Sequence, residues 1–256
     1  MSLTYEERRQ TILAQLATQG KVQVQALAEL FQVSTETIRR DLDRLEKEGE
    51  LRKVYGGAVR VRSGMIEAPF QKRSLLQLNE KQRIGAAAAS LIEDGETVML
   101  DNGTTTLEIM RQLRSRSQVT VITNSVPILA CALEDFAGKI IFAGGEINNA
   151  VQASTGPVAH ELLNQFKVNK AFISAGGISL TDGITDYMLE EALISRKMME
   201  CAEESVLVAD HTKFGRSTFA KIAPMDQISM VITDSGCPAE WVNALHQMEI
   251  EMVHSI

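Results

Sequence analysis

The sequence predicts an α/β protein in two parts: an N-terminal winged helix-turn-helix and a mostly parallel α/β domain. The first prediction rests on two short helical patterns that a tight turn separates and a basic, glycine-centred hairpin pattern follows. The second rests on short apolar runs that alternate with helical segments from residue 97 onward, as in a parallel sheet covered by helices. We therefore expect a first domain over residues 1–62, a linker over 63–79 and a second domain over 80–256.

The composition is that of a globular protein, with 45% apolar and 23% charged residues. No apolar run reaches the roughly 18 residues of a membrane span, and the N-terminus lacks the apolar core of a secretory signal. The cysteines, Cys131, Cys201 and Cys237, are odd in number and show no C-x-x-C spacing, which argues against a disulfide framework or a thiolate zinc site. These features predict a cytoplasmic protein.

The charge is divided unevenly along the chain, whose formal net charge is −7. Residues 1–73 hold 13 Lys and Arg against 10 Asp and Glu, a net charge of +3. Residues 74–256 hold 13 against 23, a net charge of −10. The positive charge therefore lies in the part predicted to bind nucleic acid, and the acidic remainder is not expected to lie along DNA.

Two helices are expected before the central one. The first covers Tyr5–Thr18 and stops before Gly20, and the second covers Val22–Gln32. The apolar faces of these helices are formed by Ile12, Leu13 and Leu16 in the first and by Ala26, Leu27, Leu30 and Phe31 in the second. Only Gln32–Val33 separates the apolar face of the second helix from Ser34, where the next helix is expected to begin, and this is the spacing of a helix-turn-helix.

The next pattern, Val33–Leu45, is the helix around which the N-terminal part is organised. Ser34 is a typical N-cap residue. Ile38, Leu42 and Leu45 follow at i, i+4 and i+7 and form one apolar stripe. The opposite face carries Thr35, Glu36, Thr37, Arg39, Arg40, Asp43 and Arg44. Such a face suits the DNA major groove, although on its own the pattern is equally typical of a solvated surface helix.

After this helix, which Gly49 is expected to end, two β-prone runs surround Gly56-Gly57 and predict a hairpin, the wing. Its basic residues, Arg52, Lys53, Arg60 and Arg62, are placed to reach phosphates or a minor groove. The predicted DNA contacts are Ser34, Thr35, Glu36, Thr37, Arg39, Arg40, Arg44, Arg52, Lys53, Gly56 and Gly57.

The N-terminal residues resemble a known family. The motif consists of Arg8, Ile12 and Leu16, then Ser34-x-x-Thr37-Ile38-Arg39-Arg40-Asp41-Leu42, then Gly49 and the Arg52…Gly56-Gly57-Ala58 wing. It resembles the signature of the DeoR family of bacterial repressors and spans the whole N-terminal domain. The resemblance implies a transcriptional regulator that binds operator DNA.

In the second part, strands are expected at 97–100, 119–122, 139–143, 170–174, 206–209 and 230–233. Helices are expected at 80–92, 106–113, 126–133, 158–166, 189–202 and 238–248. Small polar residues follow strand after strand, at the carboxyl edge where open α/β sheets bind ligands.

The clearest of these turns is Asp101-Asn102-Gly103-Thr104-Thr105-Thr106. Its glycine, its hydroxyls and the helix that starts behind it favour a bound phosphate, while the alternative is an ordinary N-capped turn.

A second polar turn is Asp210-His211-Thr212-Lys213-Phe214-Gly215-Arg216. Its two cations, Lys213 and Arg216, suit an anion, and Asp210 suits sugar hydroxyls. No other histidine has ligand spacing to His211, so we expect no metal site there. On the helix at 189–202, the charged residues Glu190, Glu191 and Lys197 either reach the same edge or form a solvated face.

This part resembles the sensor domain of the same family. The matching residues are Asp101-x-Gly103-Thr104-Thr105, Thr123-Asn124, Gly144-Gly145, Gly176-Gly177-Ile178, Asp182-Gly183, Glu191, Lys197 and Asp210-x-x-Lys213-Phe214-Gly215. The resemblance implies a fold similar to ribose-5-phosphate isomerase and CoA transferases, and a phosphorylated sugar or related catabolite as effector. The predicted effector contacts are Asp101, Asn102, Gly103, Thr104, Thr105, Thr123, Asn124, Gly144, Gly145, Gly176, Gly177, Glu191, Lys197, Asp210, Lys213 and Phe214.

The preferred hypothesis is a repressor of sugar-metabolism genes that the effector releases from DNA. It is expected to be a homodimer or homotetramer, with no catalytic residues, metal or cofactor. The alternative is a phosphosugar isomerase-like enzyme with an appended DNA-binding module, in which Asp101, Asp186, Glu191 and Lys197 would serve acid–base chemistry. A third hypothesis, a nucleic-acid-binding structural protein, leaves the ligand edge of the sheet unused.

Overall fold

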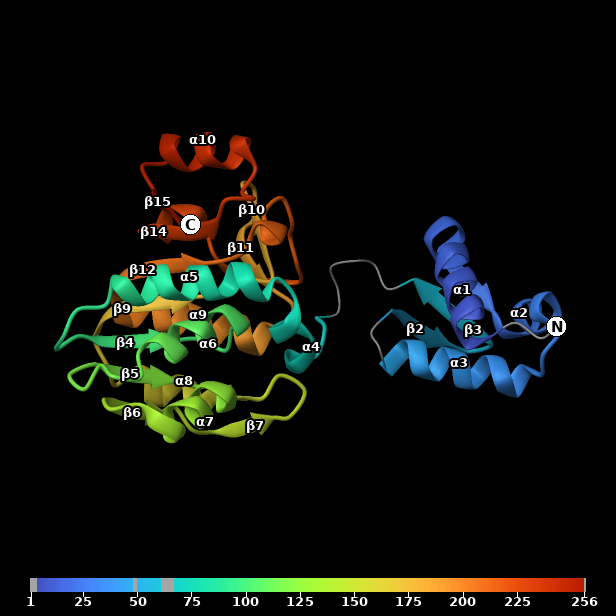
Figure 1. The fold of residues 1–256 in the computed structure, drawn as a ribbon, viewed down its shortest axis with the longest axis horizontal. Coiled ribbons are helices and arrows are strands. Elements are labelled where there is room, and N and C mark those ends of the chain that lie inside the picture. Colours follow the sequence, from blue (N-terminus) through green and yellow to red (C-terminus); the bar gives the residue numbers. More distant parts are fainter. Residues whose placement is uncertain (1–3, 48–49, 61–66, 256) are drawn as a thin grey trace. The chain divides into compact units, whose positions relative to one another are not determined.

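The computed structural model describes residues 4–47, 50–60 and 67–255. The chain forms two compact units, Met1–Ala68 and Pro69–Ile256, and each is described by itself (Figure 1). The predicted residues Gly49 and Arg62 lie outside the described residues.

The N-terminal unit is a winged helix-turn-helix, as predicted. Its helices are α1 (Tyr5–Gln19), α2 (Val24–Phe31) and α3 (Thr35–Lys47), and its strands are β1 (Lys21–Gln23), β2 (Leu51–Val54) and β3 (Gly57–Arg60). The strands form an antiparallel sheet in the order β1-β3-β2. The predicted start of the second helix at Val22 is wrong, because Val22 and Gln23 pair with Ala58 and Gly57 of β3.

The core of this unit confirms the helical patterns of α1 and α3. In α2 the predicted apolar face is only half right, because Leu27 and Phe31 are buried but Ala26 and Leu30 are exposed. Ile38, Leu42 and Leu45 of α3 are fully buried, together with Ile12 of α1 and Leu27 of α2. The apolar stripes of the three helices therefore face one another, which leaves the opposite face of α3 to solvent.

The C-terminal unit is built on a seven-stranded sheet in the order β15-β14-β12-β9-β4-β5-β6, in which every neighbouring pair is parallel. The strands are β4 (Thr97–Leu100), β5 (Thr120–Thr123), β6 (Lys139–Phe142), β9 (Val168–Ile173), β12 (Ala202–Val208), β14 (Met230–Asp234) and β15 (Glu251–Ser255). The predicted mostly parallel α/β domain is confirmed.

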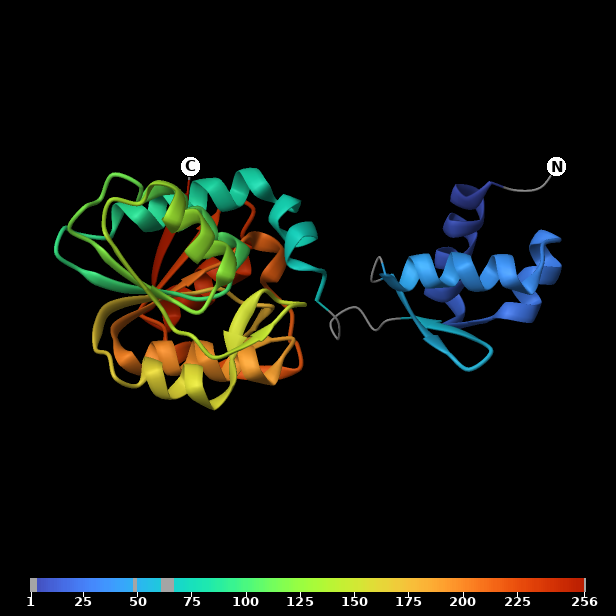
Figure 2. The same ribbon diagram turned by 90° about the horizontal axis from the view of Figure 1, so that it is seen from below.

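Helices cover both faces of this sheet. The helices α4 (Phe70–Leu75), α5 (Leu78–Ser90), α6 (Thr104–Gln112) and α7 (Val126–Asp135) pack on one face, and α8 (Gly156–Leu163), α9 (Leu189–Cys201) and α10 (Ala239–Gln247) pack on the other. In Figure 2 the teal and green α5–α7 lie on one side of the sheet and the yellow and orange α8 and α9 on the other. Each face has its own apolar core.

Several short elements were not predicted from the sequence. They are β7 (Glu146–Asn148) paired with β8 (Ala153–Thr155), a small sheet of β10 (Gly177–Ser179), β11 (Gly183–Asp186) and β13 (Ala220–Ala223), and the edge strand β15. The range 63–79, interpreted as a linker, contains α4 and the start of α5. Phe70 of α4 is buried in the core beside α5, so this helix belongs to the C-terminal unit.

Candidate functional sites

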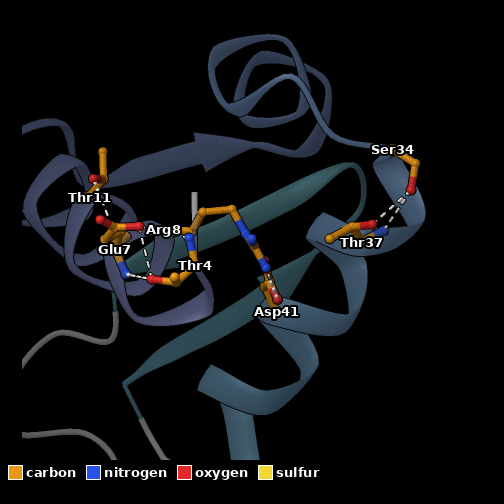
Figure 3. A network of polar contacts seen from close by, with 7 residues as sticks. All are labelled: Thr4, Glu7, Arg8, Thr11, Ser34, Thr37 and Asp41. Atoms are coloured by element: carbon orange, nitrogen blue, oxygen red, sulfur yellow. Dashed lines mark hydrogen bonds and ion pairs between the residues drawn. The ribbon is translucent and has the colours of Figure 1, made fainter. Parts of the chain in front are cut away.

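The N-terminus of α3 is closed by the predicted cap. The Ser34 hydroxyl accepts a hydrogen bond of 3.1 Å from the Thr37 backbone N–H and lies 2.9 Å from the Thr37 hydroxyl (Figure 3). The Thr37 hydroxyl is therefore part of the cap in the free protein, which leaves Thr35 and Glu36 as the exposed polar side chains of the first turn.

A buried ion pair fixes α3 against α1. Arg8 donates from Nε and from its terminal nitrogen to the two carboxylate oxygens of Asp41, at 2.7 and 3.2 Å. Figure 3 shows the two side chains meeting between the helices. The side chains are only 10% and 9% exposed, and the hydrogen bonds from Arg8 to Asp41 raise the pKa of the guanidinium. The pair is a geometric constraint on which face α3 presents.

The exposed face of α3 carries three arginines whose guanidinium groups are engaged differently. Arg39 lies 3.6 Å from Glu36, one turn earlier. Arg44 stacks over the Tyr5 ring, 4.2 Å from its centroid. Arg40 is exposed and forms no ion pair with any residue that the structure describes, so it is the arginine most available to a partner.

The wing is tied to α3 and to β1. The Lys53 ammonium pairs with Asp43, and the Lys53 backbone N–H donates to Glu46 at 2.7 Å. Gly57 is required by the close approach of β1, since a Cβ there would lie 2.1 Å from the Val22 carbonyl oxygen. Lys53 is thus held against α3 in the free protein. The backbone of Arg52 lies in β2.

In the C-terminal unit, the strand order places a switch point between β4 and β9. From β4 the chain continues to β5 on one side, and from β9 it continues to β12 on the other. Asp101 follows β4 and Ser174 follows β9. The Asp101 carboxylate accepts from the Ser174 N–H and hydroxyl at 2.7 and 2.8 Å. Such a switch point at the carboxyl edge is where doubly wound sheets bind ligands.

Asp101 organises the turn that the sequence marked as a phosphate loop. Its other oxygen accepts from the Gly103 N–H at 3.0 Å and from the Thr106 hydroxyl at 2.9 Å. Burial raises the pKa of Asp101 to about 6, against the opposing effect of the hydrogen bonds from Ser174 and Thr106. A Cβ on Gly103 would lie 2.4 Å from the Ser174 hydroxyl. The Asp101 carboxylate therefore fixes the turn after β4 against the turn after β9. Thr104 and Thr105 are the first two residues of α6.

Two buried side-chain amides at this edge have an oxygen without a hydrogen-bond partner among the described residues. Asn102 donates to the Val151 carbonyl at 2.8 Å and to the Glu191 carboxylate at 2.9 Å. Asn124 donates to the Ser154 carbonyl at 2.9 Å. The Oδ1 atoms of both asparagines are buried and unsatisfied, a costly state that a ligand hydroxyl would relieve.

A buried lysine lies beside the second polar turn. Lys81 is 4% exposed and donates to the Arg73 carbonyl at 2.6 Å. Its pKa is lowered from 10.5 to about 8, mainly by burial and also by the charges of Lys213 and Arg73, while the charges of Asp210 and Glu108 oppose the shift. These groups converge although α4, α5, α6 and the turn at 210–213 supply them. The result is a cluster of three cations and two carboxylates, and an anion beside the cations would stabilise their charge.

Helix geometry puts Lys81 level with the phosphate-loop turn. Gly85, one turn later on α5, lies against the Glu108 backbone, where a Cβ would be 2.7 Å from the carbonyl carbon. Because α5 and α6 both run antiparallel to β4, Lys81 is level with Thr104, one turn before Glu108.

Not all predicted effector contacts converge on this edge. Glu191 does, through Asn102. Lys197 does not, because it pairs with Glu200 and lies 3.5 Å from Asn164, just after α8. Six residues separate Glu191 from Lys197, a rotation of about 240° around the helix, so the two side chains leave α9 on different faces.

Most of the other predicted contacts pack against, or hydrogen-bond with, neighbouring residues of the unit, and Gly144 is the exception. The Thr123 hydroxyl donates to the Leu100 carbonyl at 2.7 Å. Phe214 is buried edge-on against Trp241, with ring centroids 5.2 Å apart. Gly176 and Gly177 face the Tyr187 ring and the Arg216 carbonyl, and a Cβ would lie 2.9 and 2.7 Å from them. Gly144 and Gly145 follow β6, where a Cβ on Gly144 meets no atom within 4 Å. Asp210 accepts from the Thr212 N–H at 3.0 Å.

Sequence reasoning missed Lys81, Arg73 and Ser174. The signal for Lys81 was available: it stands on the apolar face of α5, in helical register with Ile84, Gly85 and Ala88. A lysine on a buried stripe is rarely tolerated without a partner. Among the described residues, no group of His, Cys, Asp and Glu is arranged to hold a metal ion, and no helix is long and apolar enough to cross a membrane.

A winged helix-turn-helix joined to an α/β unit with a ligand edge defines a ligand-responsive DNA-binding regulator. The chain matches the model of the DeoR-like helix-turn-helix domain over residues 8–64 and that of the DeoR C-terminal sensor domain over residues 76–235. It therefore belongs to the DeoR family of transcriptional regulators.

Named relatives are similar in sequence to this chain over nearly its full length. The chain is 35% identical to a putative aga operon transcriptional repressor of Escherichia coli O157:H7, over 96% of this chain and 93% of that protein. It is 34% identical to the transcriptional regulator IolR of Bacillus subtilis strain 168, over 92% of this chain and 93% of that protein.

Among solved structures, ribose 5-phosphate isomerase A of Methanocaldococcus jannaschii is similar, with a TM-score of 0.40 and 18% identity over 52% of this chain and 53% of that one. The named relatives are regulators, so the chain is a DNA-binding regulator rather than an isomerase-like enzyme.

Proposed function

We propose that this regulator is a repressor that binds a phosphorylated sugar at the carboxyl edge of its parallel sheet and then releases operator DNA. The observation that carries the proposal is a pair of unsatisfied amide oxygens, on Asn102 and Asn124, at an edge that also holds Lys81 and Lys213. Acceptors for hydroxyl groups beside cations for a phosphate match the two ends of a sugar phosphate.

The division of labour follows from the chemistry of each group. The phosphate would lie at the N-terminus of α6, where the backbone N–H groups of Thr104 and Thr105 and the charges of Lys81 and Lys213 favour an anion. The hydroxyls of the sugar would donate to Asn102 and Asn124. The carboxylates of Glu191 and Asp210 would accept from further hydroxyls.

The exposed face of α3 would read the major groove, with Arg40 the principal base or phosphate contact and Arg39 beside it. A relative named as a putative operon repressor supports repression as the result of DNA binding, and release by the effector is the part of the proposal that the titration below tests. We further propose that the protein acts as a homodimer or homotetramer, because a single winged helix buries too little DNA surface for tight, specific binding. Light scattering that shows a monomer at micromolar concentration, with and without DNA, would contradict the assembly.

The test of the effector site is a thermal-shift screen over sugar phosphates, with inorganic phosphate as a reference. A ligand at about 100 times its Kd stabilises the protein by about 2.7 kcal/mol. The best ligand is then titrated into a complex of the full chain with DNA selected from a random duplex pool. We expect the unmutated protein to release the DNA.

Three lysine variants sharpen this test. Lys213→Ala and Lys81→Ala are expected to need at least about tenfold more ligand for release, with DNA binding intact in its absence. Lys197→Ala is the matched control, since its ammonium pairs with Glu200 outside the site, and it should respond normally. A normal response in Lys213→Ala would show that the phosphate of the ligand does not bind next to Lys213. A response lost only in Lys197→Ala would show that the effector binds at Lys197, as first predicted from the sequence, and not at Lys81 and Lys213.

A further inference from the structure

One edge strand of the seven-stranded sheet is unpaired on its outer side. The outermost strands are β15 and β6, at opposite ends of the sheet (Figure 1). Among the described residues, none pairs with the outer side of β15. Exposed edge strands are templates for pairing with another chain, and a lysine on the edge is a common obstacle to it. The strand β6 begins with the exposed Lys139, whereas β15 carries no lysine or arginine.

The hydrogen bonds of β15 indicate which of its backbone groups face outward. The Glu251 N–H donates to the Ser229 carbonyl, just before β14, at 3.3 Å. Because backbone groups alternate in direction along a strand, those of Val253 and Ser255 face β14 as well. The N–H and C=O groups of Met252 and His254 therefore point away from the sheet, where a further strand could pair with them.

A polar hollow lies beside this edge. Val253 packs in the core beneath α5, and side chains alternate along a strand, so Glu251 and Ser255 lie on the α5 face of the sheet as well. The hollow, of about 510 Å³, lies between α5 and the end of β15, and Arg83 and Ser255 are among the residues that line it. Ser255 is 4% exposed, and its hydroxyl has no hydrogen-bond partner among the described residues. A cation and an unsatisfied hydroxyl together suit a carboxylate.

We propose that β15 pairs in antiparallel fashion with β15 of a second copy of this chain, about a two-fold axis at Val253. The inference rests on the proposed assembly and names its interface. With Val253 opposite itself, Met252 lies opposite His254 of the second copy, so the outward N–H and C=O groups of both strands are paired. A register shifted by one residue would place inward-facing groups opposite outward-facing ones.

The same register brings opposite charges together. Glu251 of the second copy lies opposite Ser255, and side chains opposite each other on one face have Cβ atoms about 5 Å apart. Its carboxylate can then accept from the Ser255 hydroxyl and pair with Arg83. The described ion-pair partner of Arg83 is Glu80, one turn earlier on the same helix at 3.5 Å, which is a weak contact near the surface. The two-fold axis repeats the new contact, so the surface is complementary to itself.

Charge reversal in the full chain tests the interface. Arg83→Glu and Glu251→Arg should each weaken self-association at least about tenfold, because like charges then face each other across the two strands. Analytical ultracentrifugation at micromolar concentration should show assemblies of half the unmutated mass. The double variant Arg83→Glu/Glu251→Arg should restore the unmutated assembly. Lys139→Glu, on the opposite edge of the sheet, is the matched control and should assemble normally.

A disulfide tests the register. Val253→Cys should cross-link two copies under mild oxidation, because a residue on the two-fold axis faces itself at a Cα separation that a disulfide can bridge. Glu251→Cys and the unmutated protein are the controls and should not cross-link, since residue 251 lies opposite residue 255 and not opposite itself. Assembly that persists in both single charge variants, without the Val253→Cys disulfide, would overturn this interface and leave the proposed assembly in place. An unmutated protein that is monomeric at micromolar concentration would overturn both.

Discussion

The two units place their functional side chains in opposite environments. In the N-terminal unit, the candidate DNA contacts Arg39 and Arg40 are exposed on one helix, and a buried ion pair beneath them sets the orientation of that helix. In the C-terminal unit, the candidate effector contacts Asn102, Asn124 and Lys81 are buried and come from segments far apart in the chain. The comparison separates residues that contact a ligand from residues that fix the position of a helix or a turn. It predicts which variants lose ligand affinity and which lose stability.

The largest expected effect is the loss of the ion pair below α3. Arg8→Ala leaves the Asp41 carboxylate buried without its bidentate partner, which should cost about 3–5 kcal/mol of the stability of the N-terminal unit and abolish DNA binding. Arg9→Ala is the matched control, since Arg9 pairs with Glu6 and Glu50 nearer the surface and should cost about 0–1 kcal/mol.

Hydrogen exchange measures this loss region by region. Protection in α1 and α3 should fall in Arg8→Ala while protection in the parallel sheet is unchanged. Equal losses for the two arginine variants would mean that the pair below α3 is no stronger than a surface pair.

The same contrast explains what the sequence could predict. The spacing of Ile38, Leu42 and Leu45 along one helix was sufficient to predict their burial, because helical periodicity is a local property. The three-residue strand β1 was missed because its pairing partner, β3, lies more than 30 residues further along the chain. Local patterns do not contain such pairings.

The polar carboxyl edge of the sheet was predicted in outline, but the hydrogen-bonding role of each residue was not, and effector binding at this edge stays a prediction. Polar turns after strands predicted the edge. The role of each residue depended on which donors reached it. The Asp101 carboxylate accepts hydrogen bonds from Ser174 and from Gly103 of its own turn. The side-chain oxygens of Asn102 and Asn124 have no hydrogen-bond partner among the described residues. Hydrogen bonds between remote segments decide this, and a residue type in a turn does not reveal them.

The second effect tests the crowding at the switch point. Gly103→Ala places a Cβ 2.4 Å from the Ser174 hydroxyl, which should lower the stability of the C-terminal unit by about 1–3 kcal/mol. Gly144→Ala is the control at the same edge, because a Cβ there meets no atom within 4 Å. Chemical denaturation should separate the two variants. Equal stability would show that the β4 and β9 turns are not in close contact.

The third effect concerns the buried lysine and pH. The pKa of Lys81 is about 8 in the folded protein, below its ordinary value of 10.5, mainly because of burial. Below pH 8 the ammonium is charged in both folded and unfolded states, and the folded state bears the full cost of burying it. Between pH 8 and 10.5 the folded state releases the proton first, so this cost declines as pH rises.

Lys81→Met should therefore raise the free energy of unfolding by about 1–2 kcal/mol at pH 7, a value discounted for solvent screening. It should also flatten the increase in stability between pH 8 and 10.5. Lys139→Met, at the exposed start of β6, controls for ordinary lysines. A variant less stable than the unmutated protein at pH 7 would show that the hydrogen bond to the Arg73 carbonyl outweighs the cost of burial.

The smallest effect is confined to DNA affinity. Arg40 is exposed and has no described ion-pair partner, so Arg40→Ala should leave stability unchanged and weaken operator binding about tenfold. Lys53→Ala should weaken it less, because the Lys53 ammonium is already paired with Asp43 and must leave that carboxylate to reach DNA.

Gel shifts at several salt concentrations distinguish base contacts from phosphate contacts. If Arg40 reads a base, the loss is specific to the operator, whereas a phosphate contact lowers binding to all sequences and reduces the salt slope by about one. Unchanged affinity for Arg40→Ala on every duplex would mean that the exposed face of α3 is not the face that meets DNA. The contrast between exposed DNA contacts in the N-terminal unit and buried effector contacts in the C-terminal unit would then fail at its first term.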